Sequence, residues 1–203
     1  MLLQIGQKPE SDFHHPIGML EDCHKRILFF LKNLIKLASE GNSQALGAGN
    51  RITLEKALKY FREAAPRHTA DEEESLFPRL RETNDAQIGE VLGKIDSLER
   101  EHRWADEQHL EVDAIGRRWL EKGLIPDSDR ERLRDVLGNV LSFYERHIRM
   151  EEAEVFSAAR KLLSDSSKES IGEEMARRRG LTMCGAPANA GESDALASSD
   201  VEH

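Results

Sequence analysis

The chain has 203 residues, 33% of them charged, and a formal net charge of −9. This length suffices for one domain with a core of its own, and the acidity argues against nucleic acid or an anionic membrane as the main partner. No apolar run approaches the roughly 18 residues of a membrane-spanning helix, and the start, MLLQIGQKPESDF, is unlike a signal peptide. Two cysteines, Cys23 and Cys184, form no disulfide framework, so we expect a cytoplasmic protein.

Apolar residues recur at helical spacing along most of the chain, and no segment alternates as a strand would. Four long helices are predicted, over residues 16–39, 51–81, 86–122 and 129–163. We expect Pro66 to kink the second helix, because proline removes a backbone hydrogen bond and crowds the preceding turn. Short connections make neighbouring helices antiparallel, so the predicted fold is all-α, an antiparallel up-down-up-down four-helix bundle.

The composition changes after about Ser164. KESIGEEMARRRG is predicted to form one short extra helix, and the small, polar and acidic residues after it a disordered tail. The predicted organisation is therefore an N-terminal extension over 1–13, the bundle over 14–163, and the short helix with the acidic tail over 164–203.

Two stretches of the second and fourth predicted helices repeat each other. RHTADEEESLF contains His68 and Glu72, and RHIRMEEAEVF contains His147 and Glu151, 79 residues later. In both copies one helical face is apolar up to the histidine and then continues as His-x-x-x-Glu. A histidine and a glutamate one turn apart can reach one common centre.

The first and third predicted helices repeat in the same way, with His102 following His24 by 78 residues. In antiparallel helices, residues equally far from the shared turn lie at one level. Each of the three turns places its two flanking histidines at nearly equal distances along the chain. The four histidines and two glutamates are therefore predicted to share one layer of the core, where they would be costly without a bound metal.

Imidazole together with carboxylate suits iron, manganese or zinc. Six ligands are too many for one tetrahedral zinc, but they fit two metals, each with two histidines, bridged by Glu72 and Glu151. An additional oxo or hydroxo bridge would leave each metal an open position for dioxygen, nitric oxide or peroxide. Open positions favour two redox iron ions over a closed structural metal, with manganese or zinc as substitutes.

An alternative ligand set stays open at this stage. Glu21-x-x-His24 and Glu99-x-x-His102 match the Glu-x-x-His spacing of ferritin-like di-iron bundles. This set would leave both His68 and His147 without a role.

A polar stripe follows His102 on the third predicted helix, made of Asp106, His109 and Asp113, where the other copy is apolar. One interpretation is a solvated or proton-conducting path, with Asp106 and His109 as hydrogen-bond partners of the ligands or as a further ligand. The other is an outward rotation of the helix that leaves the stripe in solvent.

Over about residues 14 to 160 the chain resembles the hemerythrin-like (HHE cation-binding) di-iron proteins. The resemblance rests on LEDCHKRI, PRHTADEEESLFP, LEREH and YERHIRMEEAEVF. It implies a four-helix bundle around a non-haem di-iron centre whose ligands are His24, His68, Glu72, His102, His147 and Glu151. Animal oxygen carriers of the family have His-x-x-x-His on the third helix and a final aspartate. Asp106 and Glu151 depart from that pattern, so the chain is more similar to the bacterial reactive or repair-type members.

The function expected from this resemblance is to bind, and to react with, a small diatomic molecule or peroxide at open iron positions. The setting would be oxidative or nitrosative stress or iron-centre repair, with an electron donor as a partner and no catalytic side chain assigned. The alternative is a non-catalytic module that senses oxygen or holds iron. The sequence leaves turnover and oligomeric state open.

Overall fold

The computed structural model describes residues 11–40, 45–85 and 88–183. Helices account for most of this part of the chain and no strand occurs in it, so the all-α prediction is confirmed. None of the helices in these ranges is long and apolar enough to cross a membrane. The predicted acidic tail and most of the N-terminal extension lie outside the described residues.

The helical elements follow the predicted order closely. In chain order they are α1 (Pro16–Glu40), α2 (Ala48–Glu63), α3 (Ala65–Asp71), η1 (Glu72–Leu76), α4 (Phe77–Arg81), α5 (Ile88–Lys122), α6 (Asp127–Met150), η2 (Glu151–Val155), α7 (Phe156–Leu162) and α8 (Asp165–Arg178). The second predicted helix is interrupted at Ala64, and α3 then begins with Pro66 in its first turn. This is the interruption that the sequence predicts at Pro66.

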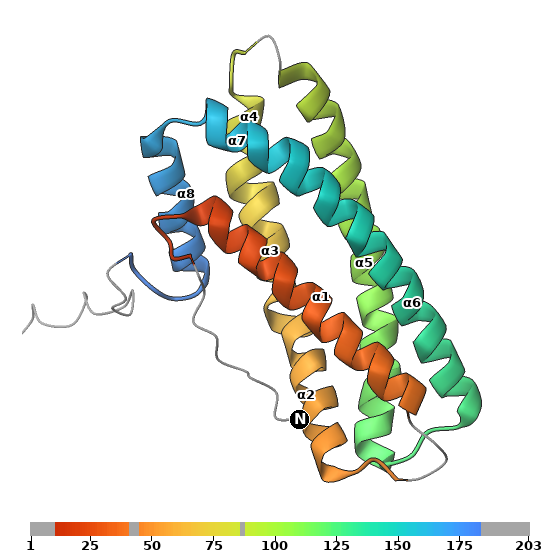
Figure 1. Ribbon diagram of the computed structural model, residues 1–203. Helices are drawn as coiled ribbons and strands as arrows, with labels where there is room; N and C mark the ends of the chain where they lie inside the picture. Colours follow the sequence, from red (N-terminus) through yellow and green to blue (C-terminus); the bar gives the residue numbers. More distant parts are fainter. Residues whose placement is uncertain (1–10, 41–44, 86–87, 184–203) are drawn as a thin grey trace, which may run out of the picture.

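Four helical columns lie side by side along the length of the molecule (Figure 1). In chain order they are α1; α2 continued by α3, η1 and α4; α5; and α6 continued by η2 and α7. The column of α1 packs against α2 and α6, and α5 in turn packs against both α2 and α6. Each column therefore has two neighbours, and the space between the columns is filled by side chains from all of them. This arrangement places four helix faces around one central axis, where a layer of side chains can converge.

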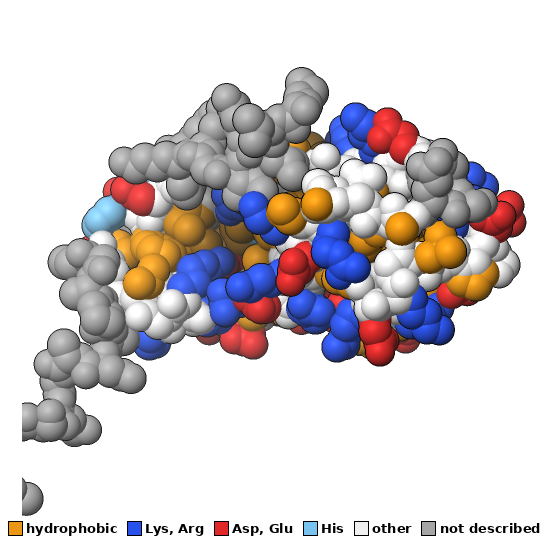
Figure 2. Space-filling model, turned by 90° about the horizontal axis from the view of Figure 1, so that it is seen from below, with side chains coloured by type: hydrophobic (Ala, Val, Ile, Leu, Met, Phe, Trp, Pro, Cys, Tyr) orange, Lys and Arg blue, Asp and Glu red, His pale blue; other side chains and the backbone are white. Residues whose placement is uncertain are grey.

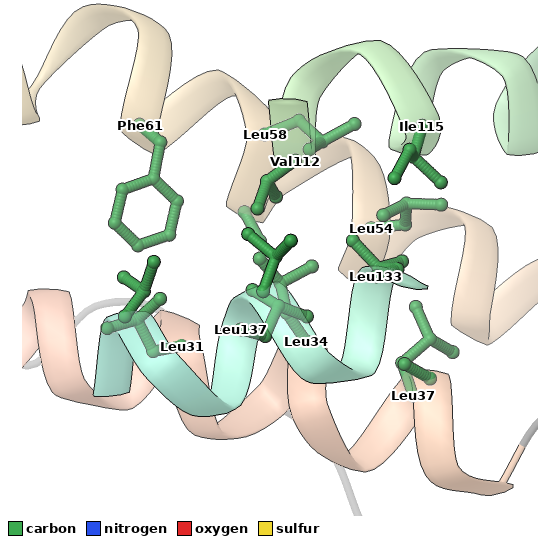
Figure 3. Packing of buried hydrophobic residues seen from close by; sticks show 14 of the residues in the cluster. Leu31, Leu34, Leu37, Leu54, Leu58, Phe61, Val112, Ile115, Leu133 and Leu137 are labelled. Carbon is green, nitrogen blue, oxygen red and sulfur yellow. The ribbon is translucent and has the colours of Figure 1, made fainter. Parts of the chain in front are cut away.

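The interior contains two separate hydrophobic clusters. The lower core includes Leu34, Leu58, Val112 and Leu137, whose side chains interlock between the columns (Figure 3). The upper core lies toward α4, α7 and α8 and includes fully buried residues such as Phe77 and Phe156. Burying one such side chain contributes about 2 kcal/mol, so each cluster is a substantial source of stability in its own right.

The helix α8 confirms the short helix predicted near the end of the described chain. The hydroxyl of Ser164 accepts a hydrogen bond from the amide of Ser167 and so caps its first turn. Its residues Ile171 and Met175 belong to the upper core. At Gly172 a Cβ atom would lie 1.9 Å from the carbonyl oxygen of Phe13, so only glycine permits this close approach.

A group of ion pairs attaches α8 to the column that contains α3 and η1. Asp71, whose side chain is fully buried, accepts hydrogen bonds from Arg178 at 2.9 Å and from Arg179 at 2.6 Å. Arg178 also donates to the hydroxyl of Ser75. Because Asp71 directly precedes Glu72, α8 is fixed to the backbone beside the predicted metal ligand.

Basic and acidic side chains are interspersed on the face of the molecule seen from below (Figure 2). The electrostatic potentials of neighbouring positive and negative charges largely cancel at a distance from the surface. On this face the surface charge therefore does not produce a broad field of one sign.

We predict that replacing Arg178 and Arg179 together by alanine lowers the free energy of unfolding by about 3 kcal/mol, because Asp71 is left buried without a partner. Urea unfolding followed by circular dichroism measures this loss. The matched control is Arg177→Ala on the same helix, which is exposed and should change stability by less than about 0.5 kcal/mol. Equal effects of the two changes would show that the buried ion pairs do not hold α8.

Candidate metal centre

A layer of six buried polar residues separates the lower core from the upper core. They are His24, His68, Glu72, His102, His147 and Glu151, each at most 5% exposed. On α1, for example, His24 comes between Leu20 of the upper core and Ile27 of the lower core. The structure thus brings together all six residues that the sequence singles out as ligands.

One half of the layer is formed by α1, α3 and the two glutamates. The rings of His24 and His68 face each other edge to face, with centroids 4.9 Å apart. Oε1 of Glu72 lies 3.4 Å from Nε2 of His68 and 3.8 Å from Nε2 of His24. Oε2 of Glu151 lies 3.1 Å from Nε2 of His24. One donor atom from each of these four residues falls within 4.8 Å of the others, which is close enough to hold one metal ion.

The other half of the layer is formed by α5, α6 and the same two glutamates. The Nε2 atoms of His102 and His147 are 3.2 Å apart. Glu151 places Oε2 at 3.4 Å from Nε2 of His147 and Oε1 at 3.8 Å from Nε2 of His102. Glu72 places Oε2 at 3.5 Å from Nε2 of His102. Glu151 therefore lies between the two histidine pairs, and one donor atom each from His102, His147 and Glu151 falls within 4.8 Å of the others. Glu72 approaches this pair through His102.

The buried polar atoms of this layer lack the partners that their chemistry requires. All four carboxylate oxygens of Glu72 and Glu151, and Nε2 of His24, are buried without a hydrogen bond. Burying such groups unpaired costs several kcal/mol. A cation between the converging atoms removes that cost, and imidazole with carboxylate is a donor set that suits iron, manganese or zinc. The residues present therefore fit a bound metal.

Three of the four histidines are held from outside by a carboxylate. The contacts join Nδ1 of His24 to Glu152 at 2.9 Å, Nδ1 of His102 to Glu73 at 2.8 Å, and Nδ1 of His147 to Glu101 at 2.7 Å. A proton on Nδ1 donates to the carboxylate and leaves Nε2 free to bind a metal. The fourth, His68, has a buried Nδ1 without a hydrogen-bond partner.

Each of the two buried glutamates begins a π-helical turn. The carbonyl of Glu72 accepts a hydrogen bond from the amide of Phe77, and the carbonyl of Glu151 accepts one from Phe156, five residues on in both cases. Such turns insert into α-helices and are frequent at functional sites. They change which side chains share a face.

The spacing of the buried residues explains why these turns form. His68, Glu72, Leu76 and Leu80 are separated by four residues each, and all of them are buried. In an ideal α-helix three such steps would drift by about 120° around the axis. The π-helical turn has more residues per turn and keeps the series on one face. A run of consecutive four-residue spacings is thus the sequence signal for it.

Burial and the neighbouring charges together set the protonation of this layer. Burial lowers the pKa of His68 well below the ordinary range, so the imidazole is neutral, which is the form that binds a metal. Burial, reinforced by the neighbouring charge of Glu151, raises the pKa of Glu72 to about 7. A metal that binds here consequently displaces protons, and its affinity falls as the solution becomes more acidic.

The two glutamates of the ferritin-like alternative lie elsewhere. Glu21 pairs with Arg160 at 2.5 Å, and Glu99 pairs with Arg81 at 2.8 Å. Neither belongs to the groups of residues that could hold a metal ion. The geometry therefore favours the set that contains His68.

The three residues of the polar stripe on α5 differ in their exposure to solvent. Asp106 is exposed one turn after His102. His109 is buried, with Nε2 at 3.4 Å from the hydroxyl of Tyr144. Asp113, also buried, pairs with Arg62 at 3.1 Å and with another arginine of α5. The stripe thus neither lies wholly in solvent nor enters the layer of six.

The fold and the layer together define a class: an all-helical protein with a buried histidine–glutamate centre for metal. Comparison with known families agrees, since the hemerythrin HHE cation-binding domain matches residues 15–159. The chain therefore belongs to the hemerythrin HHE cation-binding domain family. A relative in Haemophilus influenzae, named only as an uncharacterised protein, is 28% identical over 169 residues, which cover 83% of this chain and 92% of that protein.

We predict that His109 makes the protein sensitive to acid. Burial lowers its pKa to about 4 from an ordinary value of 6.5. The unfolded chain takes up the proton first, so this contribution to stability is present above about pH 6.5 and is lost as the pH falls toward 4. His109→Phe should remove that loss, so that the free energy of unfolding of the unsubstituted chain falls by up to about 3 kcal/mol relative to the variant.

Urea unfolding of both proteins without metal, at pH 7, 5.5 and 4.5, measures this difference. A parallel pH dependence of the two would show that His109 is not held neutral by the fold.

Proposed function

We propose that the protein binds two iron ions in the layer of six residues and reacts there with a small ligand such as dioxygen, nitric oxide or peroxide. The setting would be oxidative or nitrosative stress or the repair of iron centres. The observation that carries the proposal is the set of buried carboxylate oxygens without partners, placed between two histidine pairs. Membership of a cation-binding family supports it.

In this proposal each histidine pair holds one iron, and the two carboxylates are shared between them. We name the two places by their helices: the α1–α3 position, with His24 and His68, and the α5–α6 position, with His102 and His147. The same donors accept manganese or zinc in place of iron. Iron is favoured because two imidazoles and two carboxylates would leave coordination positions unfilled for a small ligand, whereas a closed structural site has none.

The chain's own residues prepare the site in three ways. Glu73, Glu101 and Glu152 hold the Nδ1 protons and so orient three imidazoles. Phe156 stacks parallel to the ring of His24, with centroids 5.3 Å apart, and limits its rotation. The two hydrophobic cores exclude bulk water from the layer, which strengthens its electrostatic interactions. Bound iron would supply redox chemistry and Lewis acidity.

Further parts of the proposal concern the surroundings of the site. The four packed columns would form the antiparallel up-down-up-down bundle expected from the short connections. A reducing compartment such as the cytoplasm suits a chain with two cysteines, and an electron donor would be needed for turnover. We expect neither nucleic acid nor a membrane as a partner, given the net charge of −9.

A second candidate function is a module that holds iron or senses oxygen without turnover. The contact that favours it is that of α8 with Asp71, because this surface helix is joined to the residue directly before Glu72. A change at the centre would then be passed to α8. Steady-state consumption of nitric oxide or peroxide by the reduced protein supports the reactive function. No consumption, together with metal-dependent protease sensitivity of α8, supports the second.

The first test is the metal content of protein purified from iron-replete cells. We predict about two irons per chain, and absorption of a bridged ferric pair that shifts when azide is added, because azide occupies an open position. One zinc, or no metal, would contradict the proposal.

Two variants refine this test. His68→Ala should reduce the iron content, because it removes a ligand, while Glu21→Ala should leave the iron content unchanged. The reverse result would favour the ferritin-like ligand set, which includes Glu21 and omits His68.

We also propose a supporting role for Asp106 near His102, either as a polar path or as a further ligand, with His109 as a more distant polar neighbour. Partial burial raises the pKa of the Asp106 carboxyl, and the neighbouring His102 opposes that rise. Asp106→Leu should slow the reaction with peroxide and leave the fold intact. If both iron content and the rate with peroxide are unchanged, Asp106 has no role at the centre.

A further inference from the structure

The two halves of the layer are copies of one another, yet their surroundings differ. At the offset of 79 residues Glu73 matches Glu152, and the two make equivalent contacts, to Nδ1 of His102 and to Nδ1 of His24. In each case a glutamate that follows a ligand glutamate holds a histidine of the other copy. The repeat thus extends from the ligands to the residues that orient them.

The equivalence fails at one position. Glu101 directly precedes His102 and holds Nδ1 of His147 at 2.7 Å. The matching residue, 78 positions earlier, is Cys23, which directly precedes His24. The Sγ atom of Cys23 accepts a hydrogen bond from Nη2 of Arg26 at 3.0 Å. A cysteine therefore stands where the repeat would place the carboxylate for His68.

The environment of His68 agrees with this difference. Its Nδ1 is buried and has no hydrogen-bond partner, unlike Nδ1 of the other three histidines. An imidazole that binds metal through Nε2 carries its proton on Nδ1, so a buried donor stays unsatisfied. His68 is thus the one histidine of the layer that is not oriented from outside.

The aromatic neighbours of His147 and His68 also differ, and again His68 is the less restrained of the two. Phe143 stacks on the ring of His147, with centroids 5.2 Å apart and planes 28° apart. The matching residue 79 positions earlier is Ala64, at the interruption between α2 and α3. His68 therefore lacks both the carboxylate and the aromatic neighbour that restrain His147, and it is carried by a helix of seven residues.

A carboxylate on the outer nitrogen raises the basicity of an imidazole ligand and fixes its orientation. Its removal from a metal site typically lowers metal affinity by about 10- to 100-fold. The α5–α6 position has this support for both of its histidines, whereas the α1–α3 position has it only for His24.

We propose, on the basis of the two-metal function above, that the two positions differ in metal affinity because different residues surround their histidines. The α5–α6 position binds its metal first and tightly. The α1–α3 position binds a second divalent cation about 10- to 100-fold more weakly and exchanges it readily. Under metal limitation the protein then holds one ion and releases the other, and a different divalent metal enters at the α1–α3 position.

The test is an anaerobic titration of the metal-free full-length protein with ferrous iron, in competition with a chromophoric chelator. The expected result is two binding steps whose dissociation constants differ by about 10- to 100-fold. His68→Ala should abolish the weak step alone, and His147→Ala should abolish the tight one. Loss of the tight step in His68→Ala would reverse the order and overturn the inference.

Exchange of the residues that differ between the copies gives a sharper test. Glu101→Cys should weaken the tight step until the two constants approach each other, and Cys23→Glu should strengthen the weak step. Because Cys23 is buried, its replacement by glutamate risks misfolding, whereas the side chain of Glu101 is 33% exposed and tolerates change. Cys23→Ala is the matched control and should leave both constants unchanged. Circular dichroism and thermal melting check the fold of each variant.

The outcomes separate this inference from the proposed function. Two steps with equal constants in the unsubstituted chain, or no effect of Glu101→Cys, would overturn the inference and leave the two-metal centre standing. A chain that binds fewer than two ions at saturation would contradict the two-metal function itself.

Discussion

Two buried carboxylates that have no hydrogen-bond partners are the constraint on which the rest of this structure depends. Glu72 and Glu151 are fully buried between two apolar clusters. Their carboxylate oxygens contact no solvent and accept no hydrogen bond. A cation among the converging donors would balance such charges in an interior of low dielectric. The π-helical turns, the outer glutamates and the ion pairs of α8 can all be understood as means of holding these two side chains in place.

Much of this arrangement could be predicted from the sequence, because it repeats. The His-x-x-x-Glu pairs and the levels set by the short turns were sufficient to find the layer and its six residues. The role of Glu101 could not be found this way, since it is one of many charged residues on α5 and only the packed helices show that it reaches His147. The π-helical turns were missed because the prediction assumed a uniform helical period. The partner of Asp71 was also out of reach, because it comes from α8, 107 residues further along the chain.

The repeat also shows how a chain can make two similar positions chemically different. The ligands themselves are matched, so the inequality has to arise from what surrounds them. Cys23 stands opposite Glu101, and Ala64 opposite Phe143, in the alignment of the two copies. Both differences lie beside His68, which follows the interruption at Ala64. Inequality is thus introduced through orientation and packing, while the donor set stays the same.

The division of the interior by a polar layer has a consequence for cooperativity. In most small domains one continuous apolar core makes the whole chain unfold as a unit. Here α8 and the ends of the columns are stabilised by the upper core, and the connections at the other end by the lower core. With the layer charged and unpaired, the two regions become separate units for local opening and amide exchange. Cations held at both positions would together bond to ligands from all four columns. Loading the centre would then convert two loosely coupled units into a single cooperative one.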